Sequence, residues 1–257
     1  MSAYLEAMIE AALAAGDEIE CIYAEGCATE EKEDGSPVTI ADRHAERIIL
    51  DQLGRAFPDI AILAEEEACE GRIPELGRLF FCVDPLDGTK GFVARTGEFT
   101  VNIALIDGSE PVAGVIYAPD LRTLYYGERG EGAFRALGGG DPEPIHARPV
   151  PSSQRIGVGS RNHADPGTAA RNARLAIADY VPSGSSLKFC TIAEGRADVY
   201  PRYGRTMEWD TAAGQAILEA AGGRVMALDG DQEDGPLAYR KSERDFDNPH
   251  FIAWGAL

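Results

Sequence analysis

The chain has 257 residues, 44% of them hydrophobic, which is enough apolar material to fill one large domain or two smaller ones without stabilising disulfides. Its formal charge of −19 repels DNA, RNA and anionic lipid, so a nucleic-acid polymer is excluded as an expected partner. A small anionic substrate remains compatible with this charge, because bound divalent cations can invert the local field in a site.

The first half of the chain predicts two helices followed by a sheet. Apolar residues recur at helical spacing from Leu5 to Ile22, and a second helix is expected over residues 40–56, ending before Pro58. Short apolar strands follow, separated by Gly, Pro and Asp: IAIL (60–63), LFFCV (79–83), FTVNIALI (99–106), PVAGVIYA (111–118) and LRTLYYG (121–127). The pattern favours a largely antiparallel sheet with at least one covered face.

Glycine and proline cluster over residues 137–153, which makes this stretch the expected linker. It divides the chain into an α+β metal-binding lobe at 1–140 and an α/β substrate-completing lobe at 150–257. In the second lobe, strands are expected at 156–160, 197–201, 223–228 and 251–254, alternating with helices at 166–178, 185–194 and 210–221.

Cysteine and histidine usage argues against disulfides and against a zinc site. The five cysteines are odd in number and lack C-x-x-C spacing, so they are expected to be buried thiols of a reducing compartment: Cys21, Cys27, Cys69, Cys82 and Cys190. The four histidines are dispersed. The acidic N-terminus and the lack of a long apolar run predict a cytoplasmic protein without a transmembrane segment; peripheral attachment to the inner membrane and a homodimer are left open.

The most informative segment is Asp84-Pro85-Leu86-Asp87-Gly88-Thr89, which follows an apolar strand. Two aspartates three residues apart across a proline-containing turn can converge on one point, and glycine lets backbone N–H groups approach a phosphate. The plainer alternative is an ordinary Asp-Gly turn with a solvated Asp84.

Other acids carry two interpretations each. Glu65-Glu66-Glu67 follows a strand and could be a solvated acidic run. Asp210 could be a helix N-cap, which does not exclude metal ligation, and Thr39 with Asp42 fits a capping box.

Gly184-Ser185-Ser186-Leu187-Lys188 could be a serine-capped helix start or an anion site made of free amides and a lysine.

If Glu65, Asp84, Asp87 and Asp210 converge, neighbouring carboxylates ~4 Å apart repel by roughly 4 kcal/mol. They would need cations, and an all-oxygen ligand set favours Mg²⁺, Mn²⁺ or Ca²⁺ over zinc.

These segments in this order resemble the lithium-sensitive, magnesium-dependent sugar phosphatase superfamily of inositol monophosphatase and fructose bisphosphatase. The resemblance covers nearly the whole chain, through SPVTIAD, AEEE, DPLDGTKGF, EFTVNIALI, GSSLKFC and EWDTAAG. Lys90, the run SRNHAD, the stretch from GSSLKFC to EWDTAAG and the ending DNPHFIAWG resemble most the bacterial CysQ-type branch, the 3'(2'),5'-bisphosphate nucleotidases. The resemblance implies a layered αβαβα sandwich with a mainly antiparallel N-terminal sheet.

The resemblance also implies a site. Two or three Mg²⁺ ions would be held by Glu65, Asp84, the carbonyl of Leu86, Asp87 and Asp210. The water-activating residues would be Thr89 and Asp42, with Glu65 helping to orient the water. The substrate phosphate would lie against the Gly88 and Thr89 amides. Substrate-binding residues would be Glu65, Leu86, Asp87, Gly88, Thr89, Gly184, Ser185, Ser186, Lys188, Arg202 and Asp210.

Two positions depart from the family pattern. Arg202 stands where inositol monophosphatases place a sugar-binding glutamate, and it could pair with a second phosphate. The loop reads DGTKGF, whereas the bacterial nucleotidases have an acid in place of Gly91, which bears on fine specificity.

The resemblance implies hydrolysis of adenosine 3',5'-bisphosphate to AMP by in-line attack of water, without a covalent intermediate. The closest alternative is an inositol monophosphatase or fructose bisphosphatase using the same mechanism. An aspartyl-phosphate phosphatase is disfavoured, since it needs two acids two residues apart and Asp84 and Asp87 are three apart. A regulator that kept the fold and lost turnover is disfavoured because every ligand position is filled.

Overall fold

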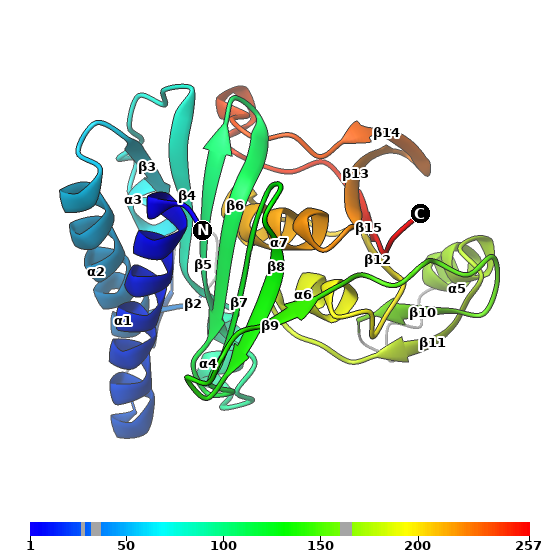
Figure 1. Cartoon of the computed structure of the whole chain (residues 1–257), viewed down its shortest axis with the longest axis horizontal. Coiled ribbons are helices and arrows are strands. Elements are labelled where there is room, and N and C mark those ends of the chain that lie inside the picture. Colours follow the sequence, from blue (N-terminus) through cyan, green and yellow to red (C-terminus); the bar gives the residue numbers. More distant parts are fainter. Residues whose placement is uncertain (27–28, 32–36, 160–165) are drawn as a thin grey trace.

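The computed structural model describes residues 1–26, 29–31, 37–159 and 166–257. Helices and strands alternate in five layers: two helices, a sheet, two helices, a second sheet and one outer helix (Figure 1). This arrangement confirms the expected αβαβα sandwich.

The first sheet contains seven strands among the described residues, in the order β3-β4-β5-β6-β7-β8-β9. Only the β3–β4 pair is parallel; the other pairs are antiparallel, as the sequence predicts. Its strands are β3 (Ala61–Ala64), β4 (Leu79–Asp87), β5 (Thr100–Asp107), β6 (Glu110–Ala118), β7 (Thr123–Glu128), β8 (Gly132–Leu137) and β9 (Glu143–Ile145).

Helices α1 (Ala3–Glu25) and α2 (Ile40–Ala56) cover one face of this sheet (Figure 1). Their apolar faces pack on alternate residues of the strands in one buried cluster, which includes Met8, Ile49, Phe81 and Val101. Two short strands, β1 (Thr29–Glu31) and β2 (Pro37–Thr39), form a small antiparallel pair between the two helices in the sequence.

The second sheet runs β11-β10-β12-β15-β13-β14 among the described residues and mixes parallel and antiparallel pairs. Its strands are β10 (Arg155–Val158), β11 (Ile177–Val181), β12 (Val199–Arg202), β13 (Arg224–Asp229), β14 (Gln232–Pro236) and β15 (Phe251–Trp254). Helix α5 (Pro166–Arg174) lies on its outer side (Figure 1), and a 3₁₀ turn, η1 (Ser242–Arg244), precedes β15.

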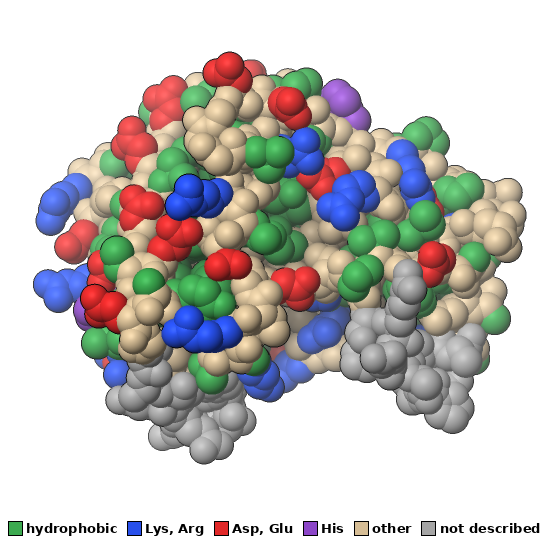
Figure 2. Space-filling view, turned by 90° about the horizontal axis from the view of Figure 1, so that it is seen from below, with side chains coloured by type: hydrophobic (Ala, Val, Ile, Leu, Met, Phe, Trp, Pro, Cys, Tyr) green, Lys and Arg blue, Asp and Glu red, His purple; other side chains and the backbone are tan. Residues whose placement is uncertain are grey.

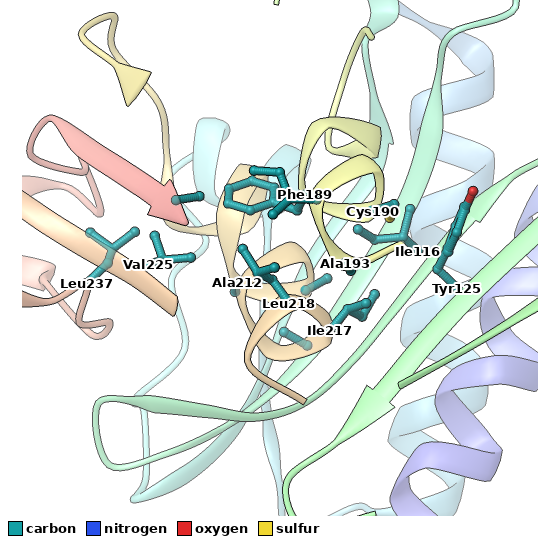
Figure 3. Close-up of a cluster of buried hydrophobic side chains, with 14 of the residues drawn as sticks. Ile116, Tyr125, Phe189, Cys190, Ala193, Ala212, Ile217, Leu218, Val225 and Leu237 are labelled. Carbon is teal, nitrogen blue, oxygen red and sulfur yellow. The ribbon is translucent and has the colours of Figure 1, made fainter. Parts of the chain in front are cut away.

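Helices α6 (Leu187–Ala193) and α7 (Glu208–Ala220) fill the space between the two sheets. Figure 3 shows Phe189 and Cys190 of α6 and Ala212, Ile217 and Leu218 of α7 in one buried cluster with side chains from both sheets. Helix α7 therefore belongs to the C-terminal half of the chain and also packs on the N-terminal sheet.

Two glycines let the α7 backbone lie directly on the first sheet. A Cβ on Gly114 of β6 would stand 2.4 Å from the Ala213 carbonyl oxygen, and one on Gly127 of β7 would stand 3.0 Å from the Ile217 Cα. Glycine weakens a strand interior, so its use here is explained by the close approach of the helix.

Several boundaries differ from those expected. The helix predicted at 166–178 ends at Arg174, and strand β11 follows it. The stretch 137–153, expected to be a linker, contains β9, which pairs with β8. The division into two lobes stays a prediction. The run SRNHAD (160–165) lies outside the described residues.

The expectation of buried cysteines is half right. Cys82 and Cys190 are buried, whereas Cys21 and Cys69 are exposed because they lie on outward faces of α1 and α3 (Glu65–Cys69). Cys27 lies outside the described residues. Within the ranges described, no helix is long and apolar enough to cross a membrane.

Candidate active site

A bulge at the end of β4 brings Asp84 and Asp87 to the same side of the first sheet. Residues three apart on a regular strand face opposite ways, but here Asp84 pairs with Asn102 and Asp87 with Thr100 of β5. The extra residue in β4 restores a common face. The fully buried Asp84 carboxylate also accepts a hydrogen bond from the Leu86 amide (3.0 Å), which fixes this turn.

The turn continues into α4 (Thr89–Val93) through Gly88, whose φ of +91° favours glycine. The Thr89 Oγ1 lies 3.0 Å from Asp42 Oδ1 and 3.2 Å from the Leu86 carbonyl oxygen. A hydroxyl carries one hydrogen, so Thr89 donates to one acceptor at a time.

Asp42 is held from the opposite side by the start of α2. Its Oδ2 accepts hydrogen bonds from the Thr39 amide and the Thr39 hydroxyl, both at 2.7 Å, while the Thr39 hydroxyl accepts from the Ala41 amide. The predicted capping box is therefore confirmed. The same carboxylate faces Thr89 with its other oxygen, so capping and contact with Thr89 coexist.

Asp87 connects the N-terminal turn to the GSSLK segment. Its Oδ2 accepts from the Ser185 hydroxyl (2.5 Å) and the Ser186 amide (2.6 Å). The two serine hydroxyls also lie 2.7 and 2.8 Å from Thr100 Oγ1. The Ser186 amide is therefore bound by Asp87, and it is not the free amide expected of an anion site. Ser186 precedes α6 without a side-chain cap bond.

Asp210 lies in the first turn of α7, three residues after Met207. The sequence allowed it to be the N-cap, but Met207 holds that position, and the Asp210 carboxylate accepts from the Met207 amide at 2.7 Å. The helix begins at Glu208, two residues before the expected start.

The acids interact strongly with one another. Burial raises the pKa of the Asp84 carboxyl well above its usual range, and the carboxylates of Glu65 and Asp87 raise it further. Loss of water likewise raises the pKa of Asp210, with added repulsion from Asp87 and Glu65. Four acids drawn from α3, β4 and α7 therefore lie within electrostatic reach of one another, whereas their role as metal ligands stays a prediction.

The donor chemistry of this region fits a hard divalent cation. The candidate donors are carboxylate oxygens and the Leu86 carbonyl, and their mutual repulsion is relieved by positive charge. No three His, Cys, Asp or Glu side chains in the described ranges form a ready-made metal cage. Asp87 and Asp210 are instead held by the protein amides named above.

Two basic side chains lie next to these acids. The half-buried Lys188 donates from Nζ to the Ser185 carbonyl at 2.9 Å. Burial lowers the Lys188 pKa and Arg202 lowers it too, against the opposing effects of Asp87 and Glu98, so these groups are within electrostatic reach. Arg202 Nη2 donates to the Arg205 carbonyl at 3.2 Å.

Arg202 retains unused hydrogen-bonding capacity. In the part of the chain that the structure describes, its Nε is buried without an acceptor. A buried guanidinium N–H left unpaired costs free energy, so Arg202 favours an added anion.

Glu46 of α2 is a site residue that the sequence did not reveal. Its buried carboxylate accepts from the amides of Glu66 (2.8 Å) and Glu67 (3.0 Å), the first turn of α3 that carries Glu65. Burial raises the Glu46 pKa to about 7. A glutamate within a helix is usually solvent-facing, so no local signal marked it.

The end of the molecule that carries α4 is not uniformly acidic. Figure 2 views the molecule from below Figure 1, and Lys and Arg side chains lie among the Asp and Glu side chains on that face. Basic side chains are therefore present at this end of the molecule despite the net charge of −19.

The inositol monophosphatase family model matches residues 1–253. This chain belongs to the inositol monophosphatase family. The resemblance inferred from the sequence motifs is thus confirmed.

Within the family, the chain is similar to nucleotidases over almost its whole length. The 3'(2'),5'-bisphosphate nucleotidase CysQ of Salmonella typhimurium is 42% identical over 250 residues, covering 96% of this chain and 98% of the relative. CysQ of Escherichia coli strain K12 is 40% identical with the same coverage.

Solved structures agree with this placement. CysQ from Bacteroides thetaiotaomicron superposes with a TM-score of 0.81 at 39% identity, covering 99% of this chain and 97% of that one. The Thermotoga maritima IMPase gives a TM-score of 0.78 at 28% identity, covering 98% and 92%.

Proposed function

We propose that this member of the inositol monophosphatase family is a magnesium-dependent phosphatase that removes the 3'-phosphate of adenosine 3',5'-bisphosphate, giving AMP and phosphate. The observation that carries the proposal is the grouping of Glu65, Asp84, Asp87 and Asp210 near the Thr89–Asp42 pair at the end of β4. The CysQ nucleotidases, about 40% identical over 96% of the chain, support the substrate.

The residues divide the chemistry between them. Glu65, Asp84, the Leu86 carbonyl, Asp87 and Asp210 would hold Mg²⁺, for which two or three ions are expected. When bound, the metal supplies charge neutralisation and lowers the pKa of water. The Gly88 and Thr89 amides would bind the phosphate that is cleaved.

Thr89 and Asp42 would move the proton. When Thr89 donates its hydrogen to Asp42, an oxygen lone pair of the hydroxyl is left to accept a hydrogen bond from water. As water attacks phosphorus and the ester P–O bond breaks, the water proton would pass to Thr89 while the Thr89 proton passes to Asp42. The departing 3'-oxygen would take a proton from solvent water to become the 3'-hydroxyl of AMP. Glu65 would help to orient the water.

Substrate choice would depend on the second phosphate. Lys188, the last residue of the GSSLK segment, and Arg202 are two cations within electrostatic reach of each other, and a bisphosphate offers them a group that a monophosphate lacks. Gly184, Ser185 and Ser186 would shape this side of the pocket. A homodimer stays a prediction.

The test is phosphate release with Mg²⁺ from adenosine 3',5'-bisphosphate, inositol 1-phosphate and fructose 1,6-bisphosphate at equal concentrations. The nucleotide is expected to give a kcat/KM more than about tenfold above both sugars, equal to ~1.4 kcal/mol of transition-state binding. A higher kcat/KM for one of the sugar phosphates would contradict the proposed substrate but not the proposed metal site. No release from any of the three contradicts the activity.

A further inference from the structure

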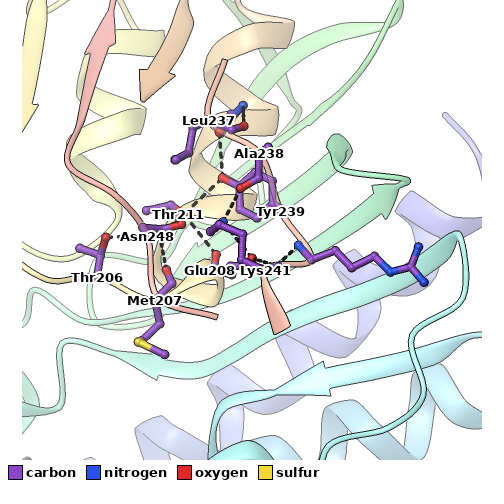
Figure 4. A network of polar contacts seen from close by, with 11 residues as sticks. Thr206, Met207, Glu208, Thr211, Leu237, Ala238, Tyr239, Lys241 and Asn248 are labelled. Carbon is purple, nitrogen blue, oxygen red and sulfur yellow. Dashed lines mark hydrogen bonds and ion pairs between the residues drawn. The ribbon is translucent and has the colours of Figure 1, made fainter. Parts of the chain in front are cut away.

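Residues Leu237–Asn248, which we name the strap, hold the first turn of α7 through a buried ion pair. Glu208, the first residue of α7, has no solvent-exposed surface. Its carboxylate accepts from the amides of Arg240 (2.8 Å) and Lys241 (2.7 Å) and pairs with the Lys241 ammonium at 2.8 Å (Figure 4). The charge of Glu208 is thus fully compensated by the strap.

The far end of the strap holds the residues that flank Glu208. Asn248 Nδ2 lies 2.7 Å from the Met207 carbonyl, 3.0 Å from Thr211 Oγ1 and 3.3 Å from Thr206 Oγ1 (Figure 4). Its backbone amide donates to the Thr206 carbonyl at 2.9 Å. Asn248 therefore contacts residues on both sides of Asp210 in the sequence: Thr206 and Met207, which precede α7, and Thr211, which lies within it.

The strap is also attached to the N-terminal half of the chain. The Tyr239 amide donates to the Ser109 carbonyl in the β5–β6 turn at 3.0 Å. The Arg240 guanidinium donates to the Leu76 carbonyl, between α3 and β4, at 2.6 Å. Leu76 lies in the segment that joins α3, which carries Glu65, to β4, which carries Asp84 and Asp87, whereas Asp210 comes from α7. The strap bridges the two sources of acids.

We propose that Glu208 and Asn248 are positioning residues: by holding the strap against the first turn of α7, they set where Asp210 stands relative to β4 and so set the affinity of the site for a divalent cation. This inference rests on the proposed function only in taking Asp210 as a metal ligand. A buried ion pair often contributes little stability compared with apolar residues of the same size, so a role in positioning accounts for its presence here.

The test measures Mn²⁺ binding to the metal-free 257-residue chain by the electron paramagnetic resonance signal of free Mn²⁺, with no substrate present. Glu208→Ala is expected to bind Mn²⁺ about 10- to 100-fold more weakly than wild type while still unfolding cooperatively. Glu208→Gln, which keeps an oxygen acceptor for a strap amide, is expected to recover most of the affinity.

Glu194→Ala is the matched control. Glu194 follows α6, and its side chain is 5% exposed. It accepts from Arg135 Nη1 (2.7 Å) and the Tyr125 hydroxyl (3.0 Å), so its loss also breaks a buried ion pair. It has no bond to the strap or α7 in the described contacts, and unchanged Mn²⁺ affinity is expected despite a lower Tm.

Three results would overturn the inference. The first is a Glu208→Ala variant whose Tm falls as in the control but whose Mn²⁺ affinity stays within twofold of wild type. If Glu208→Ala does not fold, Asn248→Ala decides by the same measurement, and unchanged affinity overturns the role. A wild-type chain that binds no Mn²⁺ contradicts the proposed metal site itself, and the strap's role with it.

Discussion

The Thr89 hydroxyl lies 3.0 Å from the Asp42 carboxylate, although the two residues are 47 positions apart in the chain. Thr89 is the first residue of α4, which follows the β4 turn, and Asp42 completes the capping box of α2. The other Asp42 oxygen is occupied by Thr39, so the carboxylate cannot rotate freely and keeps one oxygen directed at Thr89.

Thr89→Val should remove the proton acceptor while keeping the shape of the side chain. We expect kcat to fall by about 10²- to 10⁴-fold with KM changed little, because general base catalysis typically contributes that much. Steady-state kinetics with saturating Mg²⁺ measure both constants. Thr96→Val, at an exposed threonine three residues after α4, is the control and should keep wild-type kcat. Equal kcat values for the two variants would contradict the role of Thr89.

Asp87→Asn should lower kcat/KM by more than about a hundredfold while leaving the far-ultraviolet circular dichroism unchanged. The asparagine oxygen can still accept from Ser185 or Ser186, so the GSSLK segment stays attached, but the charge that would bind the cation is lost. Asp107→Asn, an exposed acid at the far end of β5, should be nearly neutral. Near-normal turnover by Asp87→Asn would exclude it as a ligand.

Arg202→Met should reduce discrimination between substrates more than it reduces catalysis. Losing a charge-assisted hydrogen bond costs roughly 1.5–3 kcal/mol, so kcat/KM for adenosine 3',5'-bisphosphate should fall by about tenfold or more. The value for inositol 1-phosphate should change much less. Arg196→Met, an exposed arginine paired with Glu194, should alter neither value. A uniform loss for both substrates would place Arg202 outside the second-phosphate site.

The raised pKa of Glu46 predicts a pH dependence of stability. Its pKa is about 7 in the folded chain against an ordinary 4.5, so between these values only the unfolded chain has lost the proton. The contribution of Glu46 to the free energy of unfolding is therefore present below pH 4.5 and is lost as pH rises through 7, by at most about 3 kcal/mol.

Urea unfolding of wild type and Glu46→Gln from pH 4.5 to 8 measures this contribution. The glutamine does not titrate, so the variant should become more stable relative to wild type as pH rises. The exposed Glu10→Gln is the control and should show no such trend. A difference between wild type and Glu46→Gln that stays constant with pH would contradict the prediction.

Gly114→Ala should destabilise the chain by roughly 1–3 kcal/mol, since the added Cβ would meet the backbone of Ala213 at 2.4 Å. That cost outweighs the ~0.4–1 kcal/mol gained from a stiffer unfolded chain. Gly54→Ala is the counterpart in α2, where nothing lies within 4 Å of the new atom, and it should stabilise by about 0.5–1 kcal/mol. Denaturant midpoints of the two variants should move in opposite directions.

The sequence predicted what is local. The acids of the site follow apolar strands or open a helix, so Glu65, Asp84, Asp87 and Asp210 could be found from short motifs. Their convergence could be assigned only through the family resemblance, because they come from α3, β4 and α7, which packing alone brings together.

The strands and buried acids that could not be predicted from the sequence have no periodic pattern of apolar residues. Strand β14, QEDGP, is a charged edge strand held by backbone pairing with β13, and β11 is likewise half exposed at the other edge. Glu208 was missed for the same reason as Glu46: its position on a helix predicts exposure. An acid in the first turn of a helix is ordinarily stabilised at the surface by the helix dipole. Burial of these two glutamates depends on the strap and on α3, which no local pattern predicts.

The placement of α7 has a consequence for the order in which the chain is made. Synthesis runs from the N-terminus, so all seven strands of the first described sheet leave the ribosome before α6 and α7, which cover one of its faces. Until residues 187–220 emerge, apolar side chains such as Phe80 and Ile116 are exposed on this face of the sheet. A chaperone or a neighbouring nascent chain can therefore bind them before α6 and α7 do. A chain truncated before residue 187 therefore leaves this face of the sheet exposed, whereas one truncated between residues 220 and 248 covers the face but lacks the Asn248 contact to Met207 at the start of α7.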